Sequence, residues 1–287
     1  MILNNTIPIN IQFKSKRRIM DISRCPTNFS YEYISRVINT SINEKCYHCD
    51  WFRRYGKYYY FKNMFPIREL LMAELFSMYG IECVDYTLAK NSEFTGVMSM
   101  NFRTFRNNYD RIDAFLLKRT GCETPENNTT ISLLDKLLRD STDDKSRIAI
   151  MRDLTKMLAL DFVTGQADRY ARNIIIEGPK NSQEAHLAPL TDNGVCFRDY
   201  CIDINENYIQ DLNFKAPTNK DTLALIQENE LFRSTLYSLL DVEFGDIIKR
   251  TETKHGISID EDAWESMIEL FDRKKDIVES ALKLVRK

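Results

Sequence analysis

The feature that most constrains the fold is a polar loop that lies directly after a long apolar helix pattern. Between residues 147 and 162, apolar side chains recur at helical spacing, which predicts a buried central helix, and Gly165 provides a stop. The loop that follows carries Asp168 and, five positions on, Asn173. Because Asp and Asn are common in loops for their turn chemistry, this pair indicates little by itself.

The chain beyond the loop makes the pair informative. Asn173 leads into the strand-like run Ile174-Ile175-Ile176, and a second short strand near Leu187 precedes Asp192-Asn193-Gly194. The polar turn between the strands would bring Asp192 back beside Asn173. Phosphoryl transfer needs mainly a positioned hydroxyl, a divalent metal and fixed cations. A carboxylate at Asp168 can orient the attacking hydroxyl, while Asn173 and Asp192 offer the oxygen ligands that Mg²⁺ prefers.

The first hundred residues have the pattern of strands around one helix. Aromatic-rich runs on either side of the turn-forming residues 54–57 predict a hairpin, and Pro66 suits the first turn of a helix that Gly80 can end in a left-handed conformation. The expected elements here are strands at 47–52 and 58–62, a helix over 67–79, and strands at 81–88 and 94–100. After residue 102 the patterns become helical; the last helices are expected at 221–240, at 243–250 and from Ser258, a good N-cap, to Val285.

Composition excludes several classes of protein. An apolar content of 43% argues against disorder, and a formal net charge of -2 gives no overall attraction to nucleic acid or to an anionic membrane. No run approaches the roughly 18 apolar residues of a membrane span. An odd number of cysteines, seven, and a start without signal-peptide features predict a cytoplasmic protein, although export by a route that needs no signal stays open.

The loop from Asp168 to Asn173, together with Leu187-Ala188-Pro189-Leu190-Thr191-Asp192, resembles the catalytic and metal-binding segments of the HipA-like kinases, including the small CtkA-type kinases. The resemblance implies an α+β, two-lobed protein-kinase-like fold, with a strand-rich N-lobe over residues 1–100 and a mainly helical C-lobe over residues 101–287. It further implies transfer of the γ-phosphate of ATP to a Ser or Thr of a protein. Asp168, Asn173 and Asp192 would be catalytic, and the last two would bind Mg²⁺.

The resemblance also assigns residues to ATP. Lys62, at the end of the second hairpin strand, would hold the phosphates and pair with a glutamate of the following helix. Register with the family favours Glu69 as that partner, whereas helical phase places Glu74 nearer the apolar stripe; we prefer Glu69. Residues 96–102, with Met98 and Met100, resemble the hinge where the adenine hydrogen-bonds to the backbone.

Two departures keep alternatives open. Residues 35–45 contain no glycine, although a glycine-rich loop usually covers the phosphates of a nucleotide; HipA-like kinases use a Ser-containing loop here, so autophosphorylation is expected between Thr27 and Ser41. Lipid kinases of the phosphatidylinositol type carry His where this chain has Tyr170. A small-molecule or lipid kinase and a nucleotide-binding pseudokinase are therefore the alternatives. The expected partners are a protein substrate of unknown identity and a regulatory, antitoxin-like protein.

Overall fold

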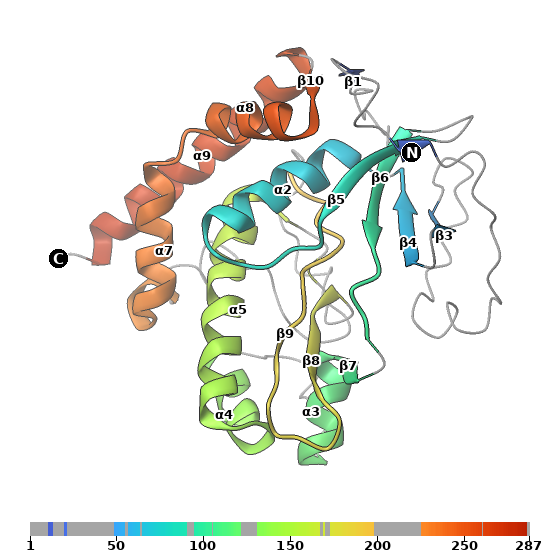
Figure 1. Ribbon diagram of the computed structural model, residues 1–287. Helices are drawn as coiled ribbons and strands as arrows, with labels where there is room; N and C mark the ends of the chain where they lie inside the picture. The colour runs from blue at the N-terminus through green and yellow to red at the C-terminus, as the bar shows by residue number, and fades with distance from the viewer. Residues whose placement is uncertain are drawn as a thin grey trace, which may run out of the picture.

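The protein has an α+β fold in which strands dominate the N-terminal part and helices the C-terminal part (Figure 1). The computed structural model describes residues 11–13, 20–21, 49–54, 57–63, 65–90, 95–104, 106–121, 131–166, 169, 173–197, 225–259 and 261–285. The expectation of fold class is thereby confirmed. No helix within these described ranges is long and apolar enough to cross a membrane.

Five of the described strands form one twisted sheet in the order β2-β5-β6-β4-β3. Its elements are β2 (Met20–Asp21), β3 (Cys49–Arg54), β4 (Lys57–Lys62), β5 (Tyr86–Lys90) and β6 (Thr95–Met100). The expected hairpin is present, because β3 and β4 pair antiparallel from Arg54 opposite Lys57 to Cys49 opposite Lys62. On its other side β4 pairs with β6, which places Lys62 opposite Val97 in the interior of the sheet.

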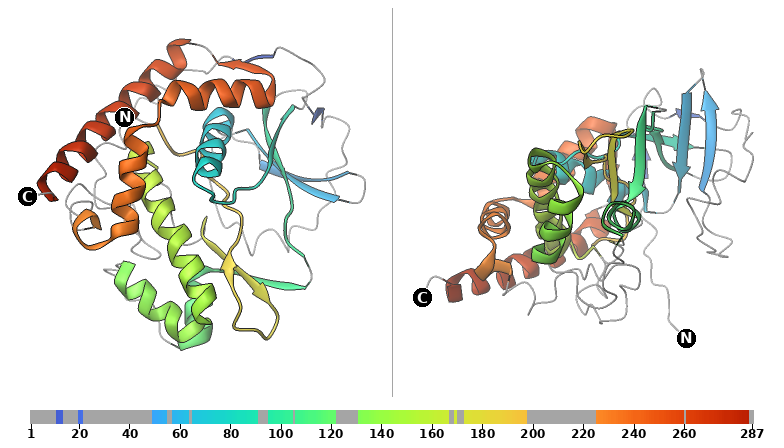
Figure 2. Two further views of the ribbon diagram at one scale, coloured as in Figure 1. Left: turned by 60° about the vertical axis from the view of Figure 1, so that its left-hand side comes forward. Right: turned by 90° about the horizontal axis from the view of Figure 1, so that it is seen from below.

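Helix α2 (Pro66–Met78) packs against β5 and β6. Pro66 occupies its first turn, as expected, and Gly80 follows its end with a φ of 68°. The helix buries side chains around most of its circumference, since α8 (Phe244–His255) covers another face and Lys254 of α8 lies 3.6 Å from Glu74. Figure 2 shows α8 crossing close to α2.

The second half of the chain is built around α5 (Asp144–Thr164). The Asp143 side chain caps its start by accepting a hydrogen bond from the Ser146 amide, and Gly165 ends it with a left-handed φ of 62°. Helix α5 contacts α4 and α9 as well as α7. Other helices of the described part of the chain are α3 (Ile112–Thr120), α4 (Ile131–Ser141), α7 (Glu230–Leu240) and α9 (Glu261–Val285).

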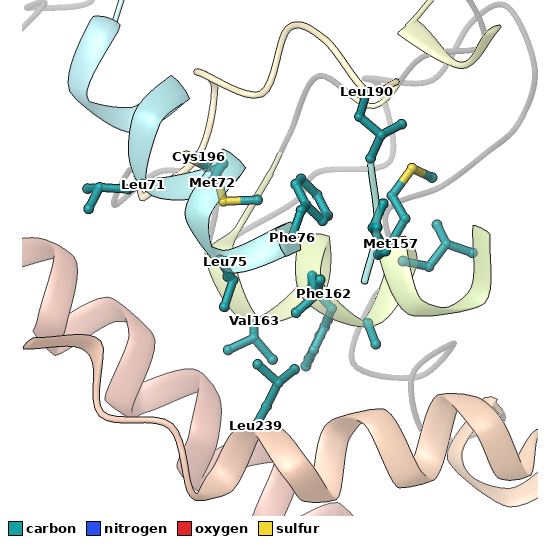
Figure 3. Close-up of a cluster of buried hydrophobic side chains, with 14 of the residues drawn as sticks. Leu71, Met72, Leu75, Phe76, Met157, Phe162, Val163, Leu190, Cys196 and Leu239 are labelled. Atoms are coloured by element: carbon teal, nitrogen blue, oxygen red, sulfur yellow. The ribbon is translucent and has the colours of Figure 1, made fainter. Parts of the chain in front are cut away.

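A continuous apolar core joins the two halves. Leu75 and Phe76 of α2, Phe162 and Val163 of α5, and Leu239 of α7 are fully buried and converge between these three helices (Figure 3). Burial of a large apolar side chain contributes roughly 1.5–3 kcal/mol, so this cluster holds α2 firmly against the helical half. The helix that carries Glu69 is therefore anchored from both sides.

The described strands form two further, smaller sheets. Strands β7 (Asn107–Arg111), β8 (Ile175–Pro179) and β9 (His186–Leu187) form an antiparallel sheet beside α5, and the β8–β9 hairpin returns the chain toward Asp192. The other sheet pairs β1 (Ile11–Phe13) with β10 (Ile257–Ile259). Strand β1 thus belongs to the first hundred residues but pairs with a strand near the C-terminus. The expected division into an N-lobe over residues 1–100 and a C-lobe over residues 101–287 stays a prediction.

Several expected element boundaries were wrong. Residues 81–85 are not a regular strand: they hold only an isolated bridge between Cys83 and Leu190, and β5 starts at Tyr86. Ser258 does not cap the last helix, because it lies in β10 opposite Gln12 and α9 begins at Glu261. Ile148 is one of the apolar residues in the 147–162 pattern that predicted a buried helix, but it is 59% exposed because only the later turns of α5 are enclosed on all sides.

The close approach of β6 to β4 yields a stability prediction. A Cβ added at Gly96 would overlap the carbonyl oxygen of Lys62 and lie 2.9 Å from the Asn63 Cα, so the strands must separate. Gly96→Ala should therefore lower the free energy of unfolding by about 1–3 kcal/mol, as overpacking does elsewhere. Urea denaturation followed by circular dichroism measures this.

Gly245→Ala is the matched control, since no described heavy atom lies within 4 Å of the added methyl group. Gly245 is in α8, where alanine should leave stability unchanged or raise it by up to about 1 kcal/mol. A Gly96→Ala protein as stable as this control would contradict the described strand packing.

Candidate active site

Lys62 is the centre of the candidate site. It ends β4, its side chain is 7% exposed, and its ammonium group contacts the carboxylates of both Glu69 and Asp192. Burial opposes the positive charge, but Asp192 and Glu69 outweigh burial and raise the pKa of Lys62 above its ordinary value. The site therefore holds a fixed cation at any physiological pH.

The carboxylate of Glu69 accepts hydrogen bonds from several groups besides the Lys62 ammonium. Its Oε1 contacts Lys62 and accepts a hydrogen bond of 3.0 Å from the Gly194 amide, while Oε2 accepts from the Asn193 amide at 2.8 Å and from the Tyr86 hydroxyl at 2.9 Å. Burial, and then the charge of Glu69, raises the pKa of Tyr86 well above its ordinary value, so its hydroxyl stays protonated and donates. A fully buried carboxylate is thus supplied with donors on both oxygens.

The geometry distinguishes the two candidate glutamates. Glu69 is fully buried and faces Lys62, whereas Glu74 faces Lys254 of α8. Gly194 is required at its position, because a Cβ there would lie 2.9 Å from Oε1 of Glu69 and 3.1 Å from the Phe65 Cβ. The Asp192-Asn193-Gly194 segment therefore sits directly against α2.

Asp192 and Asn173 are placed by neighbouring elements. Asn173 is buried just before β8, and Asp192 follows β9 with its side chain 37% exposed. The side-chain amide of Gln166, at the end of α5, donates to the Asp192 carbonyl at 3.4 Å. The side chains of Asp192 and Asn173 both offer hard oxygen ligands. Such a pair suits Mg²⁺, which proteins usually bind through one or two side chains together with the phosphates of the substrate. Among the described residues, no group of three acidic, His or Cys side chains could hold a metal ion alone.

The remaining expected residues are located as follows. Met98 is buried in β6 opposite Phe61, and Met100 is 45% exposed at the end of the same strand. The next amide, that of Asn101, donates to the Tyr58 carbonyl at 2.8 Å. Asp168 lies outside the described residues, and so do residues 27–45, where the phosphate-covering loop and its autophosphorylation were expected.

Sequence reasoning missed a buried ion pair beside the site. Arg169 binds Asp161 of α5 through two hydrogen bonds of 2.8 and 3.0 Å, and its Nη2 also donates to the Asn193 Oδ1 at 2.8 Å. Burial opposes the charge of Arg169, but Asp161 outweighs it and raises the pKa of the guanidinium. The sequence did contain a signal for this pair: Asp161 is a lone carboxylate within the apolar run around Phe162, and a buried carboxylate needs a cationic partner.

The fold of the chain is a kinase-like fold of the HipA type. The Helicobacter pylori proinflammatory kinase CtkA superposes with a TM-score of 0.63 at 15% sequence identity, over 93% of this chain and 98% of CtkA. Shewanella oneidensis MR-1 HipA, from a toxin–antitoxin complex with HipB and operator DNA, superposes with a TM-score of 0.56 at 14% identity, over 80% of this chain and 60% of HipA. No protein-family model and no curated protein sequence matches the chain. At these identities the likeness is one of fold.

The contrast between the two glutamates can be measured as stability. Glu69→Gln removes one of the two carboxylates that neutralise the buried Lys62, and it leaves the donors around residue 69 with a single acceptor oxygen. The substitution should therefore lower the free energy of unfolding by about 3–5 kcal/mol. Glu74→Gln breaks only a contact at the surface of α8 and should cost at most about 1 kcal/mol. Urea titrations of the two variants test this, and equal losses would contradict the assignment of Glu69 as the buried partner.

Proposed function

We propose that the protein is an ATP- and Mg²⁺-dependent kinase that transfers the γ-phosphate to a Ser or Thr of another protein. The observation that carries the proposal is the contact of one buried lysine, Lys62, with Glu69 on the adjacent helix and with Asp192 after the β8–β9 hairpin. An ion pair that only stabilises the fold needs one carboxylate for each lysine. A site for ATP phosphates needs a lysine that one carboxylate, here Glu69, holds in place and that lies beside a second carboxylate, here Asp192, which can bind the metal. The fold shared with the kinase CtkA and with HipA supports the same interpretation.

Each residue then has a distinct role. Lys62, oriented by Glu69, would hold phosphate oxygens of ATP, and backbone groups near Met98 and Met100 would bind the adenine. Asp192 and Asn173 would hold Mg²⁺, which when bound neutralises charge on the transferred phosphate. Asp168 would orient the acceptor hydroxyl and take its proton. Because Lys62 keeps its charge when buried, its contact with the phosphates would not depend on pH in the physiological range.

The partners follow from the same proposal. The acceptor is a protein, and autophosphorylation between Thr27 and Ser41 would place negative charge beside the ATP phosphates and slow nucleotide binding. HipA occurs in a toxin–antitoxin complex with HipB, which supports an antitoxin-like regulatory protein as a further partner for this chain.

Two asparagine variants separate these roles. Asp168→Asn should bind ATP almost as the wild type does but lose about 10²- to 10⁴-fold in turnover, because it removes only the group that faces the acceptor. Asp192→Asn should weaken the Mg²⁺ dependence of nucleotide binding as well as turnover. The measurements are isothermal calorimetry with ATP at several Mg²⁺ concentrations and transfer of labelled phosphate to protein in a cell lysate.

Arg139→Gln is the control, since its exposed ion pair with Asp135 lies on α4 and should affect neither quantity. Undiminished phosphate transfer by Asp168→Asn would remove Asp168 from the mechanism. Label that enters only lipids or small metabolites would replace the protein acceptor with one of the alternative substrates.

A further inference from the structure

Asp192 has an unfavourable backbone conformation that contacts with neighbouring residues must stabilise. Its φ is 58°, in the left-handed region, which Asp and Asn adopt more readily than other non-glycine residues but still as a minor conformation. Such a conformation costs of the order of a factor of ten in population and persists only where the surroundings over-determine it. The carboxylate that would bind Mg²⁺ is aimed by this conformation, so whatever fixes the backbone also fixes the ligand.

Backbone hydrogen bonds hold the segment on both sides of Asp192. Before it, Leu190 donates to the Glu82 carbonyl at 2.8 Å and accepts from the Val84 amide at 3.1 Å. After it, the amides of Asn193 and Gly194 donate to Glu69. These contacts fix where the segment lies, and they are available to almost any side chain at position 193.

The side chain of Asn193 adds a contact that few other residues could make. It is fully buried, and its Oδ1 accepts from the Arg169 Nη2 at 2.8 Å. The side-chain nitrogen of Asn193, Nδ2, lies 4.0 Å from the sulfur of Cys83. Burial raises the pKa of the Cys83 thiol, so the thiol next to Asn193 stays neutral. An aliphatic side chain here would leave the Arg169 donor facing an apolar group.

Arg169 is itself rigidly held. Arg169 is 3% exposed, and its guanidinium forms two parallel hydrogen bonds to Asp161, which is 1% exposed in the last turns of α5. It also lies with its Cζ 5.8 Å from the centre of the Phe76 ring of α2. A bidentate pair of this kind has defined geometry as well as strength, so Asn193 is anchored to a fixed point. Arg169 directly follows Asp168 in the chain, which ties the proposed catalytic loop to the same point.

We infer that Asn193 and Arg169 are positioning residues, and that their buried hydrogen bond, anchored on Asp161, holds Asp192 in the conformation that binds Mg²⁺. The inference rests on the proposed function of Asp192 as a metal ligand. The bond acts on the population of the binding-competent backbone rather than on the metal itself. Apparent affinity falls in proportion to that population, so losing one hydrogen bond to a charged group should weaken Mg²⁺ binding about tenfold or more.

The test compares Asn193→Leu with Asn193→Asp. Leucine has the same branched shape and the same number of side-chain heavy atoms but is larger and has no acceptor, whereas aspartate keeps an oxygen that can accept from Arg169. The readout is the Mg²⁺ concentration at half-maximal binding of a fluorescent ATP analogue, which needs no catalysis. We expect the midpoint to rise about tenfold in Asn193→Leu and to return to within about threefold of wild type in Asn193→Asp.

Ser146→Ala separates positioning from general loss of stability. The Ser146 hydroxyl accepts from the Ala185 amide at 2.9 Å at the opposite end of α5, so its removal should lower the melting temperature but leave the Mg²⁺ midpoint unchanged. If Asn193→Leu does not fold, Asn193→Ala, which adds no volume, should show the same tenfold shift.

The outcomes are distinct. A wild-type midpoint in a folded Asn193→Leu or Asn193→Ala protein overturns the inference while leaving the proposed function intact, and so does an Asn193→Asp protein that binds Mg²⁺ no better than Asn193→Leu. A wild-type protein that binds the nucleotide analogue without any dependence on Mg²⁺ overturns both the inference and the proposed function.

Discussion

The structure depends on a buried lysine that has to be neutralised. Lys62 is enclosed by Glu69 and Asp192, of which the latter is 130 positions away in the chain. Removing one partner of a buried ion pair typically costs about 3–5 kcal/mol, a large share of the stability of a protein domain. The central sheet, helix α2 and the segment after β9 therefore cannot move apart without exposing an unpaired charge. The same constraint that stabilises the fold also sets the geometry of the candidate site.

A second buried pair extends this constraint to the central helix. Arg169 and Asp161 link the end of α5 to Asn193, the residue that follows Asp192. The two ion pairs are joined through Asn193, because its side chain accepts from Arg169 and its backbone amide donates to Glu69. Around these pairs the apolar core between α2, α5 and α7 excludes water, which strengthens each electrostatic contact. Helix α8 closes the outer face of α2. The position of Glu69 is thus fixed by packing as well as by charge.

Local patterns predicted the parts of this arrangement that depend on neighbouring residues. The β3–β4 hairpin, helix α2 and the end of α5 at Gly165 follow from aromatic runs, Pro66 and glycine positions. Helical phase misled at Glu74, because the phase argument assumes one exposed face, and α2 is enclosed by the sheet on one side and by α8 on another. The resemblance to kinases supplied Glu69 instead. Strand β10 and the bridge at Cys83 were missed because their partners, β1 and Leu190, are far away in the sequence.

The most direct test of the account asks whether Lys62 touches the phosphates of ATP. An ATP derivative with a reactive acyl group on its terminal phosphate transfers that group to the neutral amine of a lysine beside the phosphates, with loss of a proton and of the phosphate. Because the bound derivative holds its acyl group next to the amine, the small neutral fraction of Lys62 is enough for labelling over long incubation at alkaline pH, and peptide mass spectrometry then identifies the lysine. The account predicts that Lys62 carries the acyl group, that excess unmodified ATP with Mg²⁺ prevents its labelling, and that the exposed lysines label without such competition. Labelling of Lys62 that is absent, or that ATP does not reduce, would contradict the assignment of this site to ATP.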